Sequence, residues 1–239
     1  MKLTLCIPMY NEKSIIEDSA RTLSAFLSAN FSDYELLFAD DGSTDGSADA
    51  VKALNLPNTR VIAYTPNRGK GFAVRTAMLE AAGDIAMFID ADLAYGTNVV
   101  RRAYDIMTEQ PDKDILIGSR AIHPDGYKGY TFVRRVASKL YIKFLCSAGG
   151  FNLSDSQCGC KAFRKSARQD IFSRCRTDGF AFDFEVLMWA QELGYSVVEM
   201  PVQIINHKES KISAVKDTFG MLREFIRIKK YVGSNSYDR

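Results

Sequence analysis

Short apolar runs alternate with longer segments of helical periodicity along the first half of the chain. The runs are four to six residues long, which is too short for a confident helix and fits a strand buried on both faces. The predicted strands span Leu3–Ile7, Tyr34–Ala39, Arg60–Tyr64, Ile85–Ile89 and Ile115–Gly118. The predicted helices span Glu12–Ala29, Gly69–Ala82 and Asn98–Gln110. This alternation predicts an α/β fold with a doubly wound, mostly parallel sheet and helices on both faces.

The strand predicted over Ile85–Ile89 ends at two carboxylates, Asp90 and Asp92, which are one residue apart. In an open parallel sheet, ligands bind at the carboxyl ends of the strands, and two carboxylates there can hold a divalent cation against a diphosphate. An isolated Asp-x-Asp is weak evidence for a metal site, and the alternative is that Asp92 caps the following turn or helix. The residues alone leave both interpretations open.

Two further polar loops are candidates for ligand binding. Asp40–Gly46 joins turn-forming residues to a helix N-cap and belongs beside the end of the first strand, although a simple turn and cap would look the same. Asn67–Gly71 looks like a phosphate loop, but it has the spacing of neither an NTPase nor a dinucleotide-binding motif. Its backbone N–H groups can still face an anion at a helix start.

Composition excludes several classes of protein. With 239 residues, 46% of them hydrophobic, the chain has room for one large domain, which we place at residues 1–211. The balance of 31 basic and 29 acidic residues gives no overall field that favours nucleic acid. The five cysteines lack paired Cys-x-x-Cys spacing, which predicts buried reduced thiols. No apolar run reaches the roughly 18 residues of a membrane span, so we expect a soluble or peripheral cytoplasmic protein.

Two segments combine apolar with basic residues at helical spacing. Tyr130–Cys146 places four basic residues among aromatic and aliphatic ones, and the tail at residues 212–239 repeats the pattern over Ile212–Val232. Such a helix suits an anionic membrane surface, but a helix that packs on a core has the same pattern. The first alternative predicts peripheral attachment to the cytoplasmic face of a membrane.

Four motifs, in this order and spacing, resemble those of the inverting nucleotide-sugar glycosyltransferases of family two, which have the GT-A fold. The motifs are Ile7–Glu12, Asp40–Gly46, Asn67–Gly71 and Asp90–Leu93. The second half is similar to the dolichyl- and polyprenyl-phosphate hexosyltransferases at Gly118–Arg120, Arg134–Arg135, Asp155–Lys161, Gly179–Glu185 and Glu199–Val202. Within that group, Gly69–Arg75 and Gly179–Asp183 favour the members that use UDP-glucose. The resemblance covers about residues 3–211.

The resemblance implies a donor site for a nucleotide sugar. The donor-binding residues that it implies are Pro8, Tyr10, Glu12, Asp40, Asp41, Lys70, Asp90 and Asp92. Among them, Asp41 would bind the base, and Asp90 and Asp92 would also hold Mg²⁺ or Mn²⁺. Lys70 has the alternative interpretation of a solvated helix residue. Ala94 stands where mannose-transferring relatives often have a further polar ligand, so the third metal ligand is open, and His207 is either that ligand or an exposed loop histidine.

The same resemblance implies a polyprenyl-phosphate acceptor. Arg120, Arg134 and Gln157 would bind the acceptor, and Asp92, Arg120 and Arg134 would form the catalytic set. We expect a single in-line displacement that inverts the configuration and moves a hexose, glucose by this resemblance, from UDP-glucose to the lipid phosphate. No general base should be obligatory, and Asp155 is the nearest candidate base by motif position.

Alternative functions remain open at this point. Transfer to a sugar or glycerolipid hydroxyl would need a general base. A glycosyltransferase releases a nucleoside diphosphate and a nucleotidyltransferase releases pyrophosphate, whereas a nucleotide-sugar-binding module releases neither of these products. Asp183 and Glu185 form a second pair of carboxylates, of which we interpret one as structural. A membrane-protein partner or a homo-oligomer is compatible with the sequence.

Overall fold

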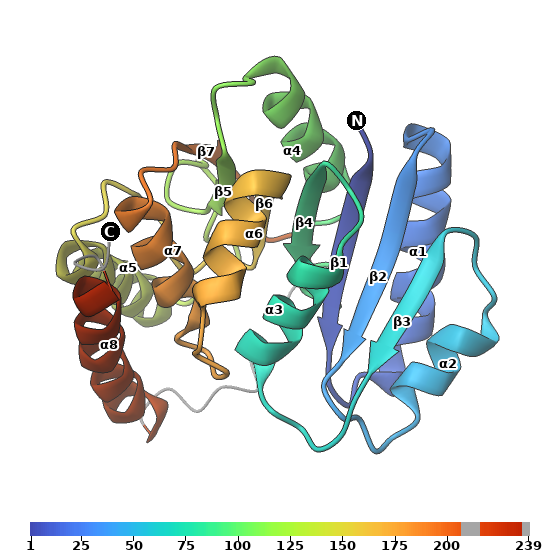
Figure 1. Ribbon diagram of the computed structural model, residues 1–239, viewed down its shortest axis with the longest axis horizontal. Coiled ribbons are helices and arrows are strands. Elements are labelled where there is room, and N and C mark those ends of the chain that lie inside the picture. Colours follow the sequence, from blue (N-terminus) through green and yellow to red (C-terminus); the bar gives the residue numbers. More distant parts are fainter. Residues whose placement is uncertain (207–215, 236–239) are drawn as a thin grey trace.

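The computed structural model describes residues 1–206 and 216–235, and within them the chain forms a seven-stranded sheet (Figure 1). The strands are β1 (Leu3–Met9), β2 (Tyr34–Asp40), β3 (Thr59–Ala63), β4 (Ile85–Ile89), β5 (Ile115–Ser119), β6 (Cys160–Arg164) and β7 (Val197–Pro201). Their order across the sheet is β3-β2-β1-β4-β6-β5-β7. The five predicted strands are confirmed to within two residues at either end, whereas the apolar pattern does not predict β6 and β7.

Strand β6 is the exception to a parallel sheet. It lies between β4 and β5, runs antiparallel to both, and pairs its first residue, Cys160, with Ile89 at the end of β4. The start of β6 therefore lies at the edge where the parallel strands end. This topology brings the loop before Cys160 next to the carboxylates that follow β4.

Helices cover both faces of the sheet, as predicted. They are α1 (Lys13–Asn30), α2 (Ser47–Ala53), α3 (Lys70–Glu80), α4 (Asn98–Glu109), α5 (Phe132–Gly149), α6 (Lys165–Arg174), α7 (Phe182–Glu192) and α8 (Lys216–Asn235). The core that holds Leu5 and Ile7 of β1 also holds side chains of α1, α2 and α4. The core around Cys6 holds side chains of α3, α6 and α7. Consecutive side chains of β1 thus enter opposite cores, as the two-residue period of a strand requires.

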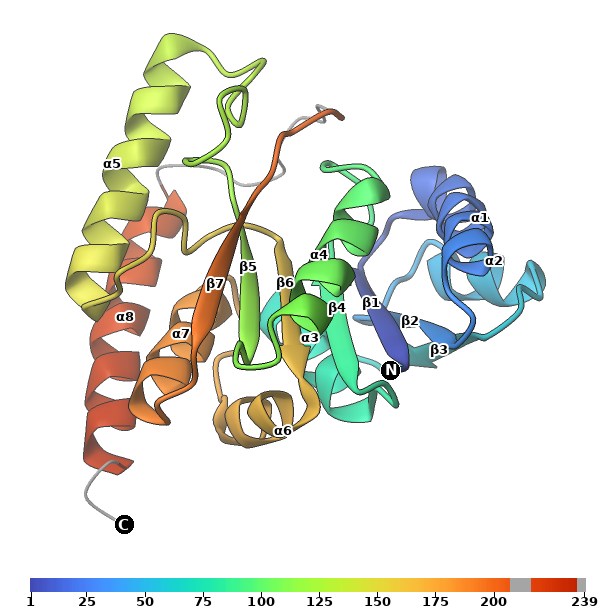
Figure 2. The same cartoon turned by 90° about the horizontal axis from the view of Figure 1, so that it is seen from above.

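Helices α5 and α8 lie side by side at the end of the molecule beyond β7 (Figure 2). Lys229 Nζ of α8 donates a hydrogen bond of 2.7 Å to Ala148 O at the end of α5. The ring centre of Phe225 lies 4.8 Å from that of Phe184 on α7. The apolar side of α8 therefore covers the core. Residues 212–215 of the predicted tail lie outside the described residues.

The two halves of α5 have different surroundings. Ile142, Leu145 and Cys146 in its second half are buried, so the core-packing alternative holds there. Its first half is exposed, and large apolar side chains line one side of the helix at four-residue spacing: Phe132, Val136, Leu140 and Phe144. Among the described helices, none has the length and apolar character that crossing a membrane requires. The five cysteines are buried and unpaired, in line with the predicted reduced thiols.

Candidate functional site

The candidate site lies along the edge where β1, β2 and β4 end. Asp40 ends β2 and Asp41 follows it, while Asp90 and Asp92 follow β4. Strand β1 pairs with β2 on one side and with β4 on the other, so Met9 at the end of β1 lies between these two groups of carboxylates. Residues that are far apart in the sequence therefore meet at one edge, as expected for ligand sites of parallel sheets.

Hydrogen bonds join the loops after β1 and β2. Asn11 N donates to the hydroxyl of Ser43, and Glu12 N donates to the hydroxyl of Ser47, both at 2.9 Å. Tyr10 is exposed beside these contacts, whereas Pro8 is buried within β1. Of the predicted nucleotide-bordering residues, Tyr10 is thus accessible to a ligand and Pro8 contributes packing.

Asp41 shapes the loop that leads into α3. Its buried carboxylate accepts hydrogen bonds from Asn67 Nδ2 at 2.7 Å, Arg68 N at 2.9 Å and Gly69 N at 2.7 Å. The anion that these backbone N–H groups face is therefore a carboxylate of the chain itself. Asp40 beside it is also buried, and this burial raises the pKa of its carboxyl above the usual value.

Lys70, the first residue of α3, forms an ion pair with Asp90. Lys70 Nζ lies 2.6 Å from Asp90 Oδ1. Burial opposes the positive charge, but the carboxylates of Asp90, Asp183 and Asp92 outweigh burial and raise the pKa of Lys70. Asp90 packs so closely on Gly159 that a Cβ at that position would collide with Asp90 Oδ2. Lys70 is therefore a charged residue of the site rather than a solvated helix residue.

A turn at residues 177–179 fixes the start of α3. Phe72 N donates to Asp178 O at 3.2 Å, and a Cβ on Gly71 would lie only 2.5 Å from Thr177 O. Glu185 of α7 holds this turn from the other side, because its carboxylate accepts a hydrogen bond of 2.7 Å from Thr177 N. Glu185 is therefore a structural residue.

Asp183 precedes Glu185 by two residues, so it lies on another side of α7, where it interacts with the charged groups of the site. It accepts a hydrogen bond of 2.5 Å from the buried Lys161 Nζ. Burial raises the pKa of Asp183, although the positive charges of Lys161 and Lys70 oppose the shift. Positive and negative groups thus alternate from Lys161 through Asp183 and Lys70 to Asp90. This division of roles agrees with the prediction that one of the two α7 carboxylates is structural.

Asp92 caps the turn that follows β4. Its Oδ1 accepts a hydrogen bond of 3.0 Å from Ala94 N, and Leu93 between them has a left-handed φ of 52°. Ile205 N donates to Ala94 O at 2.8 Å, so the segment after β7 lies along this turn. The capping interpretation thus describes one contact of Asp92. It is compatible with a metal-binding role, because a carboxylate has two oxygens with several acceptor sites.

The carboxylates at this edge supply some of the ligands that a hard divalent cation needs. Within residues 1–206 and 216–235, no three His, Cys, Asp or Glu side chains are grouped so as to hold a metal ion. Mg²⁺, however, is usually bound by one or two carboxylates together with substrate phosphates and water. Asp90 and Asp92 therefore fit Mg²⁺ or Mn²⁺ in combination with a diphosphate ligand. Ala94 adds no side-chain ligand, and His207 lies outside the described residues.

Arg120, which follows β5, forms a two-pronged ion pair with Asp155. Arg120 Nε lies 2.7 Å from Asp155 Oδ2, and Nη2 lies 3.0 Å from Oδ1. The Arg120 side chain is only 11% exposed and Asp155 is fully buried. Glu199 holds the same loop by accepting a 3.0 Å hydrogen bond from Ser154 N. Asp155 is therefore the partner of a buried cation and not a carboxylate available for proton transfer.

The other two predicted acceptor residues have different surroundings. Gln157 N donates to Asp155 Oδ1 at 3.1 Å, and the enclosed Gln157 side-chain nitrogen has no hydrogen-bond partner among the described residues. Arg134 is exposed on the first turn of α5, with its guanidinium carbon 4.2 Å from the centre of the Tyr130 ring. A hydrogen bond thus joins Gln157 to the Arg120 ion pair. Arg134 is linked to Arg120 through two tyrosine rings, because Tyr130 contacts Tyr127 and the Tyr127 ring lies 5.9 Å from the Arg120 guanidinium.

Several residues of the site were missed in the sequence. Gly159 and Lys161 flank the start of β6, and the turn at residues 177–179 precedes α7. The signal that could have found them was the family resemblance of Asp155–Lys161 and Gly179–Glu185, because apolar periodicity predicts neither element.

Comparisons with known sequences give one consistent family. The model of the family "Glycosyl transferase family 2" matches residues 4–172. Dolichyl-phosphate beta-glucosyltransferase of Dictyostelium discoideum is 29% identical over 243 residues, which cover 95% of this chain and 73% of that protein. The Saccharomyces cerevisiae protein of the same name is 29% identical over 246 residues, covering 95% of this chain and 74% of that protein. Glycosyltransferase AglD of Haloferax volcanii is 28% identical and is matched over 37% of its length.

Comparison with solved structures supports the fold. Glucosyl-3-phosphoglycerate synthase of Mycobacterium tuberculosis, in complex with Mn²⁺, UDP-glucose and glycerol 3-phosphate, matches with a TM-score of 0.71 at 19% identity, covering 97% of this chain and 80% of that chain. Its complex with Mg²⁺ and UDP matches with a TM-score of 0.69 at 18% identity, covering 97% and 79%. At such identities the likeness establishes the fold, and it confirms the predicted GT-A-like α/β architecture.

Proposed function

The chain belongs to glycosyl transferase family 2, and from this premise we propose that it transfers glucose from UDP-glucose to a polyprenyl or dolichyl phosphate with inversion of configuration. The names of relatives that match 95% of the chain support both the sugar and the lipid phosphate. The observation that carries the proposal is the grouping of Asp90 and Asp92 with the charged Lys70 at the ligand-binding edge of the sheet.

The proposed donor site supplies both signs of charge that a nucleoside diphosphate needs. When bound, a divalent ion held by Asp90 and Asp92 would act as a Lewis acid on the leaving diphosphate. Lys70 offers an ammonium that can exchange its contact with Asp90 for a phosphate oxygen. The proposed nucleotide-binding residues are Tyr10, Glu12, Asp40 and Asp41, with Asp41 acting through the loop that it holds and Pro8 contributing packing within β1.

The proposed acceptor chemistry requires no proton removal. A phosphate monoester has a second pKa of about 6, so near neutral pH an acceptor oxygen already carries the charge that attacks the anomeric carbon. A new carbon–oxygen bond forms on one face of the sugar, and the bond to the diphosphate breaks on the other. Arg120, Arg134 and Gln157 are the proposed acceptor contacts. The burial of Asp155 in an ion pair supports a reaction without a general base.

Peripheral attachment to the cytoplasmic face of a membrane is part of the proposal. Phe132 is 79% exposed and Leu140 is 64% exposed on the same side of α5. Basic residues stand beside them on the helix, among them Lys143. An exposed apolar stripe with basic neighbours is what an interfacial helix presents to anionic lipid. A lipid-linked acceptor would then reach the site from the membrane.

Product analysis tests the function directly. The protein is incubated with labelled UDP-glucose or GDP-mannose, a polyprenyl phosphate and Mg²⁺. We expect a labelled lipid and release of UDP, with UDP-glucose preferred. Release of pyrophosphate would identify a nucleotidyltransferase, and release of neither product would leave a binding module. Transfer to a sugar or glycerolipid hydroxyl, with no transfer to lipid phosphate, would overturn the acceptor assignment.

A further inference from the structure

A cavity of about 440 Å³ lies between the turn that follows Asp92, the start of α4 and the segment after β7. We call it the α4 cavity, and its volume falls in the range of about 300–1,000 Å³ that is usual for small-molecule sites. Its larger polar side chains are Tyr95, Asn98, Arg102, His123, Gln203 and Asn206. None of them belongs to the predicted donor, acceptor or metal residues, so the cavity is distinct from both proposed substrate sites.

The charge of the α4 cavity comes from Arg102. Among the described residues that line the cavity, none is acidic. The Arg102 guanidinium donates a hydrogen bond of 3.1 Å to Pro201 O, and it has no carboxylate partner in the part of the chain that the structure describes. The neighbouring Arg101, in contrast, pairs with Asp105 at 2.8 Å. Because a guanidinium has five N–H donors, Arg102 keeps donors for an anion in the cavity.

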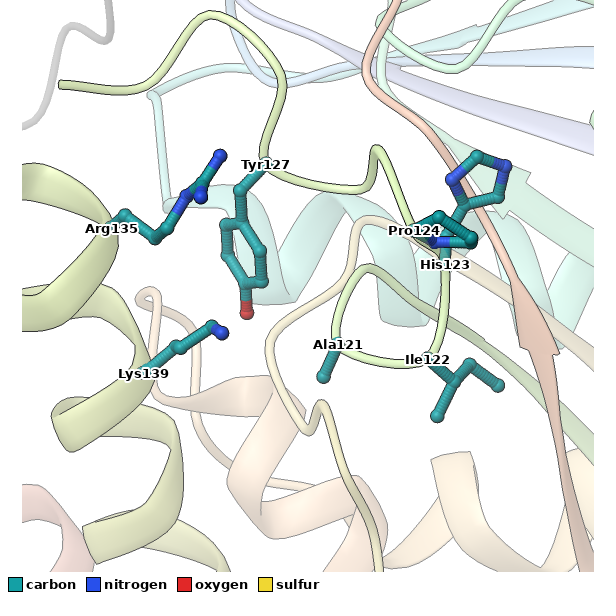
Figure 3. A pocket seen from close by; sticks show the side chains of 7 residues that line it. All are labelled: Ala121, Ile122, His123, Pro124, Tyr127, Arg135 and Lys139. Atoms are coloured by element: carbon teal, nitrogen blue, oxygen red, sulfur yellow. The ribbon is translucent and has the colours of Figure 1, made fainter. Parts of the chain in front are cut away.

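His123 adds a second donor from the loop after β5. Its Nδ1 accepts a hydrogen bond of 3.0 Å from Asp125 N, so in the neutral ring the hydrogen is carried by Nε2. Figure 3 shows the ring on the far side of this loop from Arg135 and Lys139. There it lines the α4 cavity together with Gln203 of the segment after β7. A guanidinium and an imidazole N–H are both groups that bind phosphate oxygens.

Side-chain amides supply much of the remaining polar lining. Those of Asn98 and Gln203 make no hydrogen bond with another described residue. Asn206 Nδ2 donates to Leu93 O at 3.0 Å, which leaves the amide oxygen as an acceptor. An amide both donates and accepts hydrogen bonds, and the hydroxyl groups of a sugar do the same. The lining therefore matches a small anion that also carries hydroxyl groups.

The α4 cavity shares a wall with the turn that positions Asp92. Leu93 in this turn has a left-handed φ of 52°, which is uncommon for a residue other than glycine. From the cavity side, Asn206 holds the turn through its hydrogen bond to Leu93 O and through a backbone hydrogen bond of 3.2 Å to Ala94 O. A ligand that contacts both Asn206 and Asn98 of α4 would therefore brace the turn that carries Asp92.

We propose that the α4 cavity is a second ligand site, which binds a hexose phosphate and thereby holds the Asp92 turn in place. Arg102 and His123 favour a phosphate, and the amides favour the hydroxyl groups of the sugar. The inference goes beyond the proposed function, because neither the UDP-sugar nor the lipid phosphate occupies this cavity. Since the ligand and the donor then act on the same turn, each strengthens the binding of the other.

The test uses the full chain and measures binding by calorimetry. The probes are glucose 6-phosphate, glucose and inorganic phosphate, each titrated with and without saturating UDP and Mn²⁺. Arg102→Gln removes the cation, and Gln203→Glu keeps the shape of the side chain while it adds a negative charge. Arg101→Gln is the matched control, because Arg101 is the adjacent arginine and does not line the cavity. Unfolding temperatures without ligand show that each variant is folded.

We expect glucose 6-phosphate to bind the wild type and the control equally, and to bind Arg102→Gln and Gln203→Glu about tenfold or more weakly. Equal affinity for Arg102→Gln and Arg101→Gln would overturn the proposal. So would glucose or inorganic phosphate binding as tightly as glucose 6-phosphate, because one half of the ligand would then have no role. Loss of binding when UDP and Mn²⁺ are present would place the ligand in the donor site and would also overturn it.

Kinetics tests the effect on the Asp92 turn. Glucose 6-phosphate should lower KM for UDP-glucose about fivefold in the wild type and leave it unchanged in Arg102→Gln, whose rate without the ligand should equal that of the wild type. An unchanged KM in the wild type with the ligand bound would overturn the link to this turn.

Calorimetry keeps the inference separate from the proposed function. If the wild type binds glucose 6-phosphate through Arg102 but transfers no glucose to lipid phosphate, the proposed function fails and the α4 site stands. If the wild type transfers glucose but binds no hexose phosphate, the α4 site fails and the proposed function stands.

Discussion

The ammonium of Lys70 lies 2.6 Å from the Asp90 carboxylate, so the first residue of α3 and the first residue after β4 form an ion pair at the proposed donor site. The two side chains are 27% and 33% exposed, and pairs that water reaches contribute little to stability. The pair therefore matters for position rather than for folding. The ion pair holds the Lys70 ammonium beside the carboxylates that are proposed to bind the metal. In that position the ammonium can contact a bound diphosphate.

Replacing Lys70 by methionine should impair use of the donor while preserving the fold. Lys70→Met keeps the length of the side chain and removes its charge, so we expect kcat/KM for UDP-glucose to fall by about 10²-fold, the loss of one charge-assisted contact. The unfolding temperature should stay near that of the wild type. Lys165→Met is the matched control, because Lys165 is also the first residue of a helix and is exposed. Equal kcat/KM in the two variants would exclude the donor role.

Lys70 should remain charged throughout the neutral range. Its pKa in the folded protein is raised, so the stabilisation from its charge is fully present below the unfolded pKa and is lost only as pH rises through the folded pKa. Rate profiles of wild type and Lys70→Met between about pH 6 and 9 should therefore have the same shape and differ by a constant factor. A decline at basic pH that the variant lacks would show that Lys70 titrates in that range.

Asp92→Asn separates metal binding from capping. An asparagine oxygen can still accept the hydrogen bond from Ala94 N, so the turn should survive, but a metal ligand loses its charge. We expect turnover to fall by about 10²-fold or more, with an unchanged unfolding temperature. Chelator should abolish turnover of the wild type, and Mn²⁺ or Mg²⁺ should restore it. Full wild-type activity in chelator would remove the metal from the mechanism.

The first half of the fold and the ligand-binding edge could be predicted because they follow from local pattern and topology. Strands such as β4 are buried on both faces and appear as uninterrupted apolar runs. Once the strands are parallel, their ends share one edge, so Asp41 and Asp90 had to lie near each other. The pairing of Lys70 with Asp90 was not predictable in the same way, since it depends on how α3 is seated against the turn at residues 177–179.

Strand β6 could not be predicted from apolar periodicity. It is a central strand with two basic residues, Lys161 and Arg164, which interrupt the pattern. Lys161 is buried against Asp183, 22 residues away, and Arg164 Nε donates to Lys113 O at 2.7 Å. Buried charges are tolerated where such partners exist, and the partners come from distant parts of the chain. The antiparallel strand that completes the site is therefore not predicted by apolar periodicity, although the family resemblance over Asp155–Lys161 marks where it starts.

Removing the charge of Asp155 should lower the stability of the folded protein. In Asp155→Asn the buried Arg120 guanidinium loses its ionic partner, which typically costs about 3–5 kcal/mol. For a chain of this size we expect the unfolding temperature to fall by about 10 °C. The apolar pair Arg120→Met/Asp155→Leu should recover much of this loss but not the activity, because Arg120 is a proposed acceptor contact.

Asp49→Asn is the control for this experiment, because Asp49 forms an exposed ion pair with Lys52 at 4.0 Å and should change stability little. Thermal unfolding and turnover are measured on the same samples. An Asp155→Asn protein that unfolds at the wild-type temperature but has no activity would identify Asp155 as a general base. That result would favour a hydroxyl acceptor over a lipid phosphate.

Membrane attachment should depend on the exposed half of α5 and not on the apolar side of α8. Phe132→Ser/Leu140→Ser removes two exposed side chains that have no packing role in the folded protein, so stability should change by less than about 1 kcal/mol. Each side chain contributes about 2 kcal/mol when inserted into lipid, so the pair should lower affinity for anionic vesicles on the order of 10³-fold. High salt should weaken wild-type binding by screening the basic residues.

Phe225→Ser is the contrasting variant, because Phe225 is 4% exposed against Phe184 and its loss should destabilise the fold instead. Equal sedimentation of wild type and the α5 variant with anionic vesicles would show that α5 is not the membrane contact.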